Sequence, residues 1–299
     1  MAYIDIQHID KSFGKKQVLH GVSFGIERGD RFGLIGPNGS GKTTLLLMLA
    51  GLLAPDSGRI TIDGLDPVTD GPRARARVGW MPDSVGAWDS LTAQEIVATF
   101  GRLYGLAADD AENRASDLLE EVGLSEFAHR RVSVLSRGQK QRLSLARSLV
   151  HDPAVLLLDE PASGLDPDSR IDLRGILRRR ANRGAAIVLS SHILPELEEI
   201  VDDVIMMRDG RTVAAEVPSA SVWKVTSRDG TALHRWARAA GLPSGTGTAL
   251  TPGVAWAEFT GDEESASAIL ADALAAGVTV TSFGRRTLES RYLAWRGGQ

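Results

Sequence analysis

The sequence predicts an α/β protein, because three segments combine strand-like and helical patterns around turns of small and polar residues. In the first, a glycine-rich turn at residues 36–44 separates an apolar strand pattern at residues 31–35 from a helical run. In the second, residues 154–161 form a continuous apolar run that ends in two carboxylates, which is typical of a strand buried on both faces. In the third, a polar turn at residues 135–142 leads into the helical spacing of residues 143–149.

The glycine-rich turn has the composition of a phosphate cradle. Its glycines let successive backbone N–H groups face one anion, Lys42 brings a positive charge to the β- and γ-phosphates, and the Thr43 hydroxyl can ligate Mg²⁺. A turn that only joins strand to helix would explain the glycines, but not Lys42 and Thr43 at this spacing. We therefore expect a nucleoside triphosphate here. The residues expected around it are Gly36, Pro37, Asn38, Gly39, Ser40, Gly41, Lys42, Thr43 and Thr44.

The apolar strand at residues 154–161 carries Asp159 and Glu160 at its end. Adjacent strand residues point to opposite sides, so the two acids need not share one role. Asp159 is expected to hold Mg²⁺ through water, and Glu160 to reach the γ-phosphate and orient an attacking water. The plain alternative is an acidic strand end that meets a helix. The neighbouring phosphate cradle favours hydrolysis.

The polar turn at residues 135–142 places Ser136 and Gly138 near a helix N-terminus, where a second anion could bind. A simple N-cap on a core helix explains Ser136 equally well. The order of the motifs decides between the two. From Phe13 onward the chain resembles the ATP-binding cassette (ABC) ATPases, which present a phosphate loop, this signature turn, an Asp-Glu strand, a Ser-Gly-Leu-Asp loop and a switch histidine in the same order.

The resemblance implies a fold and further residue roles. The fold is a RecA-like P-loop core with an antiparallel β subdomain and a helical lobe inserted at about residues 84–150. Phe13 is expected to stack on the adenine of ATP, and His192 to contact the γ-phosphate. A core phenylalanine and a buried, hydrogen-bonded histidine are the alternatives. Residues 163–166 are expected to cross between subunits, although Asp166 followed by Pro167 is also an ordinary helix start.

The resemblance also implies a dimer, either of two copies or of this chain with a related ATPase. In this family Ser136 and Gly138, with Gln139 beside them, face the γ-phosphate that the other subunit's loop holds. Two ATP molecules would join the halves, and hydrolysis would release them. The cofactors expected are therefore ATP and Mg²⁺, and Lys42, Glu160 and His192 are the expected catalytic residues.

Two positions depart from the family's commonest pattern. Arg137 replaces the second glycine of the signature, and Asp83 stands after Pro82 where a glutamine is usual. Aspartate can ligate Mg²⁺ but offers no N–H donor; an exposed turn residue is the alternative. An acid at this position resembles the ATPase subunits of ABC-2-type exporters. Residues 287–293 likewise resemble the C-terminal extension of exporters of the daunorubicin-resistance type.

Composition limits where the chain acts. Its 299 residues suffice for one large and one small domain, and the absence of cysteine excludes disulfides and thiolate metal sites. A net charge of −4 gives no footprint for nucleic acid, which is not expected as a partner. The longest apolar stretch, residues 45–54, is about half of a bilayer span. We expect a cytoplasmic protein, peripheral on the inner face of the cell membrane.

Two domains are expected. Residues 1–216 would form the ATPase domain, closed by a hairpin that turns at Asp209 and Gly210. Residues 217–299 would form a small accessory α/β domain. Its strand patterns lie at residues 221–226, 254–259 and 278–283, and its helical patterns at residues 231–240 and 262–276.

Together these features predict an ATP-hydrolysing subunit that drives a separate membrane-spanning permease, with export favoured over import. A soluble cassette ATPase acting on ribosomes or nucleic acid is the competing class, but its usual marks, two cassettes in one chain or a long coiled coil, do not occur. A nucleotide sensor without activity would lack Lys42, Asp159 or Glu160, and all three are present. Cargo specificity would lie in the permease.

Overall fold

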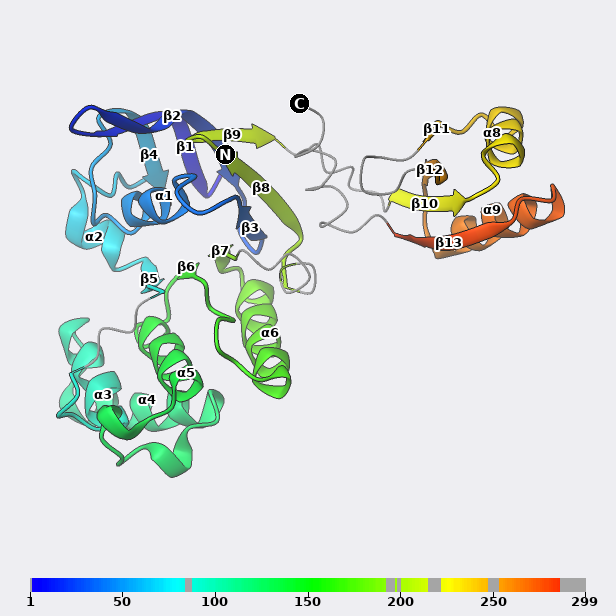
Figure 1. Cartoon of the computed structure of the whole chain (residues 1–299). Coiled ribbons are helices and arrows are strands. Elements are labelled where there is room, and N and C mark those ends of the chain that lie inside the picture. The colour runs from blue at the N-terminus through cyan, green and yellow to red at the C-terminus, as the bar shows by residue number, and fades with distance from the viewer. Residues whose placement is uncertain are drawn as a thin grey trace. The chain divides into compact units, whose positions relative to one another are not determined.

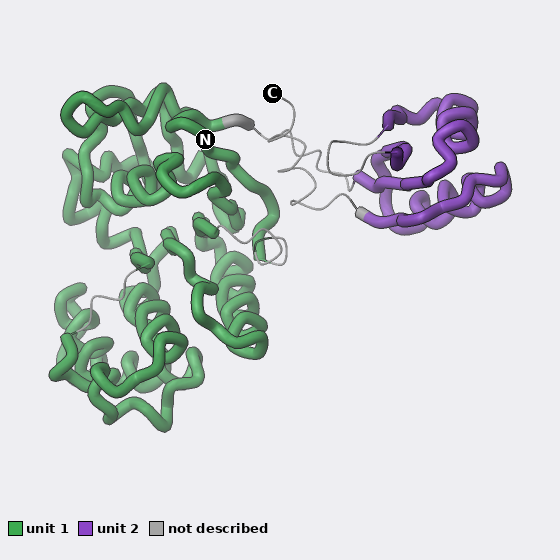
Figure 2. The backbone as a smooth tube through the Cα atoms, in the orientation of Figure 1, with its two compact units in different colours: residues 1–215 green, residues 216–299 purple. Residues whose placement is uncertain are grey.

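The computed structural model describes residues 2–83, 88–191, 197, 200–214, 222–246 and 253–285, which are coloured along the chain in Figure 1. The chain forms two compact units, residues 1–215 and 216–299, which Figure 2 colours separately. In the described part of the chain no helix is long and apolar enough to cross a membrane. His192 and the motif at residues 287–293 lie outside the described residues, as do most of residues 194–201, whose sequence pattern predicts a helix.

The centre of the first unit is a six-stranded sheet in the order β5-β6-β7-β3-β8-β9. Neighbouring strands are parallel except β8 and β9, which form the predicted hairpin with positive φ at Asp209 and Gly210. All residues of β6 and β7 are buried, which explains their apolar sequences. The strands are β3 (Arg31–Ile35), β5 (Val78–Met81), β6 (Val155–Asp159), β7 (Ala186–Ser190), β8 (Asp203–Arg208) and β9 (Arg211–Ala214).

A second, antiparallel sheet has the order β2-β1-β4. Its strands are β1 (Ile4–Phe13), β2 (Lys16–Ile26) and β4 (Ser57–Ile62), and the short helix α2 (Gly71–Arg75) follows. One buried cluster joins apolar residues of this sheet to helix α1 (Lys42–Leu49) and to strands of the six-stranded sheet. Helix α1 is thereby held by both sheets, which fixes the turn at its N-terminus.

A helical lobe is inserted between β5 and β6, as predicted, and lies at the bottom of Figure 1. It contains α3 (Ala93–Leu103), α4 (Ala108–Glu121) and α5 (Arg137–Ser148), with 3₁₀ turns at Ser125–Phe127 and Val132–Val134. Both α3 and α5 begin with a capping box: the N-cap hydroxyl accepts from the backbone amide of the third helical residue, whose side chain accepts from the N-cap amide.

Helix α6 (Pro167–Asn182) returns the chain to β7. Asp166 caps it by accepting a hydrogen bond from the Ser169 amide at 2.8 Å, and Pro167 is its first residue, as the sequence predicted. Near the other end of the helix, the buried Arg180 contacts Glu121 of α4 at 2.6 Å. The helical lobe is therefore tied to the core by an ion pair as well as by apolar packing.

In its described residues the second unit has the order β-α-β-β-α-β and one antiparallel sheet, β11-β12-β10-β13. The sequence predicted each of these elements except the short strand β11. Its core contains Val225, Leu233, Trp236, Ala257 and Phe259, contributed by strands and helices together. The elements are β10 (Val222–Ser227), α8 (Gly230–Ala239), β11 (Ser244–Thr246), β12 (Ala255–Thr260), α9 (Glu263–Ala275) and β13 (Val280–Arg285).

Candidate functional site

The glycine-rich turn connects β3 to α1 at the carboxyl edge of the parallel strands. Gly41, just before α1, has φ +104, and a Cβ there would lie 2.6 Å from a Leu19 methyl carbon. A Cβ on Gly36 would lie 2.2 Å from the Met207 carbonyl oxygen. Both positions therefore require glycine. Among the described residues no side chain caps α1, so its first N–H groups remain directed at an incoming anion.

Lys42 is 8% exposed and folds back over this turn. Its Nζ donates hydrogen bonds to the carbonyl oxygens of Gly36 at 2.7 Å and Pro37 at 3.2 Å. Burial lowers the pKa of the Lys42 ammonium, and the Glu160 and Asp159 carboxylates oppose that shift. The ammonium is thus held inside the cradle by groups that a phosphate oxygen could replace.

Asp159, the last residue of β6, is 4% exposed and hydrogen-bonded on both carboxylate oxygens. Thr43 Oγ1 donates to its Oδ2 at 2.9 Å, and Ser190 Oγ, from the end of β7, donates to its Oδ1. Glu160 follows with φ 51, a left-handed conformation that is costly for a residue with a side chain. Its amide donates to the Ser190 carbonyl oxygen at 3.2 Å, so the chain turns sharply at the mouth of the cradle.

These groups surround one open hollow of about 420 Å³. The sequence predicted ten of its lining residues, including Phe13, which is 52% exposed, and Asp83. It missed Lys16 and Val18. The full lining is Phe13, Lys16, Val18, Asn38, Gly39, Gly41, Lys42, Thr43, Thr44, Asp83, Asp159 and Glu160.

Lys16 enters the hollow because of strand pairing. In the β1–β2 hairpin it lies directly across from Phe13, so the two side chains mark the same end of the hairpin. The signal in the sequence was the turn at Gly14, which has φ 60 and brings β2 back beside β1. Recognising that hairpin would have placed Lys16 and Val18 beside Phe13.

The oxygen ligands at this hollow suit Mg²⁺, which prefers carboxylate, hydroxyl and phosphate oxygens. The Thr43 hydroxyl and the Asp159 carboxylate are already paired, and Asp83 lines the same hollow. In the part of the chain that the structure describes, no three acidic or histidine side chains form a ready-made metal cage. Mg²⁺ bound here would rest on Thr43 and Asp159 together with the triphosphate.

Comparison with known proteins identifies the family of this chain. The family profile described as "ABC transporter" matches residues 19–163. A Nod factor export ATP-binding protein I from Burkholderia lata is 42% identical over 223 residues, which are 74% of this chain and 73% of the relative. The chain belongs to the ABC transporter family. The linearmycin resistance ATP-binding protein LnrL of Bacillus subtilis is 35% identical over 71% of this chain and 68% of that protein.

Solved structures agree with this assignment. An ATP-binding subunit of an ABC transporter matches with a TM-score of 0.67 and 29% identity, over 71% of this chain and 89% of that one. A dimeric ATP-binding cassette in a post-hydrolysis state, bound to ADP and Pi, matches with a TM-score of 0.65 and 24% identity over 70% of this chain and 96% of that one, and supports the fold. The predicted family, fold class, ATP binding and ATPase activity are confirmed: this chain is an ABC ATPase.

The signature turn of this ABC ATPase does not line the hollow. Ser136, Gly138 and Gln139 are absent from the described residues that line the hollow, and they begin α5 instead. Ser136 Oγ accepts from the Gln139 amide at 3.2 Å, and Gln139 Oε1 accepts from the Ser136 amide at 2.8 Å. Ser136 is therefore the N-cap of α5, and the cap uses its hydroxyl oxygen as acceptor, which leaves the hydroxyl proton to serve as a donor.

Proposed function

We propose that this ABC ATPase powers the export of a cargo through a separate membrane-spanning permease, working from the cytoplasmic face of the membrane as a peripheral subunit. The observation that carries the proposal is the 42% identity, over 73% of its length, to a protein named for export. The relative named for linearmycin resistance supports the same direction of transport. Asp83, which lines the hollow, is the acidic residue after Pro82 that resembles the exporter branch.

In this proposal the hollow binds the triphosphate. Backbone amides of residues 36–44 and Lys42 hold the β- and γ-phosphates, and Phe13 stacks on the adenine. Thr43 and Asp159 would hold Mg²⁺, with Asp83 as a further oxygen ligand, and the bound ion would neutralise phosphate charge. Lys16, which lines the same hollow, adds positive charge to it.

Glu160 is the hydrolytic residue of the proposal. Its sharp backbone turn at the end of β6 sets the carboxylate at the mouth of the hollow, where it can orient a water molecule and accept its proton. Lys42 stabilises the charge that develops on the transferred phosphoryl group. His192 is proposed to contact the γ-phosphate, on the resemblance alone.

The proposal includes a dimer, with a second copy or a related ATPase. Ser136 and Gly138 begin a helix whose N-terminus attracts anions, yet they stand apart from the hollow of their own chain. A second cassette would bring its hollow to this turn, so that each ATP contacts both halves. ATP would favour the closed dimer because only that state makes both sets of contacts.

Copurification tests the partner. Glu160→Gln protein is incubated with ATP and Mg²⁺ in detergent-solubilised membranes of the source cell and purified by affinity, with Lys42→Ala protein as the matched control. Recovery of a polytopic membrane protein in near-equal amount with Glu160→Gln is expected. Recovery of ribosomes or nucleic acid instead would favour the soluble class, and a substrate-binding receptor together with the permease would favour import.

A further inference from the structure

Arg137, the residue that departs from the usual signature glycine, contacts the loop that follows β6. Its Nη2 donates a hydrogen bond to Ser163 Oγ at 2.8 Å. Ser163 lies in the loop of residues 160–166, which begins with Glu160 and ends at the N-cap Asp166 of α6. The contact therefore joins the first turn of α5 to the segment that carries the hydrolytic carboxylate.

The guanidinium fits against this loop because Gly164 has no side chain. A Cβ on Gly164 would lie 3.1 Å from Cδ and Nε of Arg137, and the backbone there has φ +75, which favours glycine. A Cβ on Gly138 would likewise lie 3.2 Å from the Gly164 carbonyl oxygen. The signature turn and the loop thus approach each other closely at Gly164.

Two further hydrogen bonds continue this connection to Glu160. Gln141, a buried residue one turn along α5, donates from Nε2 to the Glu160 carbonyl oxygen at 2.9 Å. The Ser163 amide donates to the same oxygen at 3.1 Å. Arg137 and Gln141 therefore hold the loop from α5 at two points, one at Ser163 and one at Glu160.

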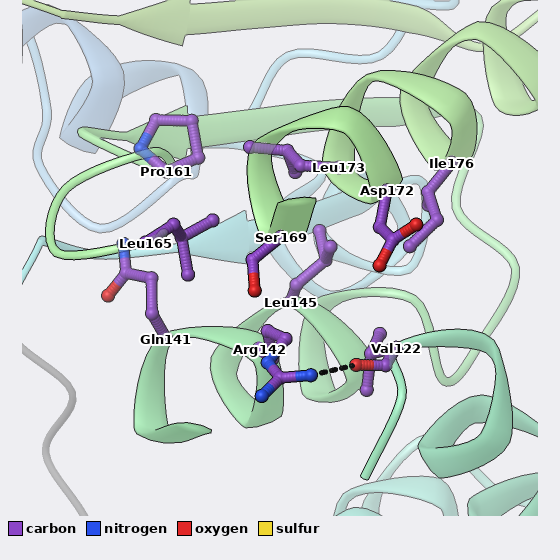
Figure 3. A pocket seen from close by; sticks show the side chains of 10 residues that line it. All are labelled: Val122, Gln141, Arg142, Leu145, Pro161, Leu165, Ser169, Asp172, Leu173 and Ile176. Carbon is purple, nitrogen blue, oxygen red and sulfur yellow. Dashed lines mark hydrogen bonds between the residues drawn. The ribbon is translucent and has the colours of Figure 1, made fainter. Parts of the chain in front are cut away.

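Figure 3 shows the packing beneath this connection. Gln141 and Leu145 of α5 face Pro161 and Leu165 of the loop around a hollow whose free volume is about 10 Å³. A space of that size holds roughly one water molecule at most. The hollow is consequently a packing seam between α5 on one side and the loop with the following helix α6 on the other, because Ser169, Leu173 and Ile176 of α6 also line it. A shift of α5 would be passed on to the loop and α6 together.

We propose that Arg137 is a positioning residue: by holding Ser163, it makes the signature turn and the loop that bears Glu160 move as one unit. The inference rests on the proposed function, in which the signature turn of one copy faces the ATP of the other. ATP bound to the partner would then set the position of Glu160 in this copy. Arg137 acts through Ser163 and touches neither the nucleotide nor the attacking water.

The test uses the full-length chain in four forms: wild type, Arg137→Ala, Ser163→Ala and the double variant, with Arg137→Lys as the conservative replacement. Hydrogen–deuterium exchange of residues 160–166 is measured first, without nucleotide. Steady-state ATP hydrolysis with Mg²⁺ follows, separating kcat from KM. Arg178→Ala is the matched control, because it removes an exposed guanidinium from α6 at a distance from the contact.

We expect Arg137→Ala to accelerate amide exchange in residues 160–166 and to lower kcat, each by roughly threefold to tenfold, while KM for ATP stays within twofold of wild type. Ser163→Ala should have the same effect, and the double variant should be no worse than either single one, because all three lack the same hydrogen bond. Arg137→Lys should restore part of both losses, since its Nζ can also donate to Ser163.

Unchanged exchange in Arg137→Ala would overturn the inference, as would additive losses in the double variant. A rise in KM with kcat unchanged would also overturn it, because that result would place Arg137 on the partner's nucleotide. Failure of the proposed function has a different signature: Glu160→Gln protein would not form a dimer with ATP and Mg²⁺, whereas the exchange comparison without nucleotide would be unaffected.

Discussion

The two helix N-termini that the proposal assigns to ATP are built in opposite ways. Helix α1 begins after Gly41 with no side-chain cap among the described residues, and the buried Lys42 lies over the turn. Helix α5 begins with a complete capping box between Ser136 and Gln139. An uncapped N-terminus with a cation is ready to bind phosphate alone, whereas a capped one offers only a hydroxyl proton and the helix dipole. The difference indicates that the N-terminus of α1 binds the phosphates of ATP by itself, whereas the N-terminus of α5 contacts ATP only after α1 has bound it.

The largest effect is expected at the Glu160 carboxylate. Glu160→Gln should lower kcat roughly 100-fold to 10,000-fold, because the amide cannot accept a proton from water. ATP affinity should change little, since the phosphate contacts of α1 remain. Steady-state hydrolysis and equilibrium nucleotide binding measure the two quantities. Hydrolysis at the wild-type rate would remove Glu160 from the mechanism.

Lys42→Ala should abolish phosphate binding at the N-terminus of α1. We expect hydrolysis to fall roughly 100-fold or more and ATP affinity to fall with it, because the charge inside the cradle is lost. The melting temperature should stay near that of wild type, since within the described residues the hydrogen bonds of Lys42 Nζ go to carbonyl oxygens of its own turn. Thermal unfolding and nucleotide titration are the measurements, and undiminished turnover would contradict the phosphate-loop assignment.

Substitutions of Ser136 separate capping from phosphate recognition. Ser136→Asp keeps an equally good N-cap, so stability should be preserved, but its carboxylate should repel the γ-phosphate and weaken the ATP-bound dimer at least about tenfold. Ser136→Ala should cost about 1 kcal/mol of stability through loss of the cap. Sedimentation with ATP and chemical denaturation report the two effects. A stable dimer of Ser136→Asp would mean that the signature turn serves only its own helix.

The smallest effect is expected at the adenine. Phe13→Ala should weaken ATP binding about fivefold, the lower end of the range for base stacking, because Phe13 is 52% exposed. Phe13→Trp is the matched control and should bind at least as well as wild type. Isothermal titration with ATP measures both. Equal affinity of Phe13→Ala and wild type would place the base elsewhere.

The local parts of the site could be predicted from the sequence, and the parts that depend on tertiary pairing could not. Residues 36–44, Asp159 and the cap at Asp166 follow from short motifs whose chemistry is contained in a few neighbouring residues. Lys16 and Val18 reach the hollow only because β2 folds back on β1. The contact between Arg137 and Ser163 joins positions 26 residues apart, so no sequence pattern indicated it.

The fold shows the same division. The strands β6 and β7 were predictable because they are buried on both faces. Each sequence is therefore a continuous apolar run that ends in a polar residue. In the second unit, the strand pattern at residues 254–259 predicted β12, whose residues alternate between buried and half-buried in the structure. Strand β11 has only three residues, Ser244 to Thr246, with none buried, and exists by pairing with β12. Its sequence contains no periodic signal.

The central claim is that ATP joins the α1 end of one copy to the α5 end of another. Light scattering of full-length Glu160→Gln with ATP and Mg²⁺, during size-exclusion chromatography, tests it most directly. We predict a mass twice that of the 32.0 kDa chain with ATP and the single-chain mass without it. Lys42→Ala in the same background should remain a single chain. An unchanged mass for Glu160→Gln under saturating ATP would contradict the account.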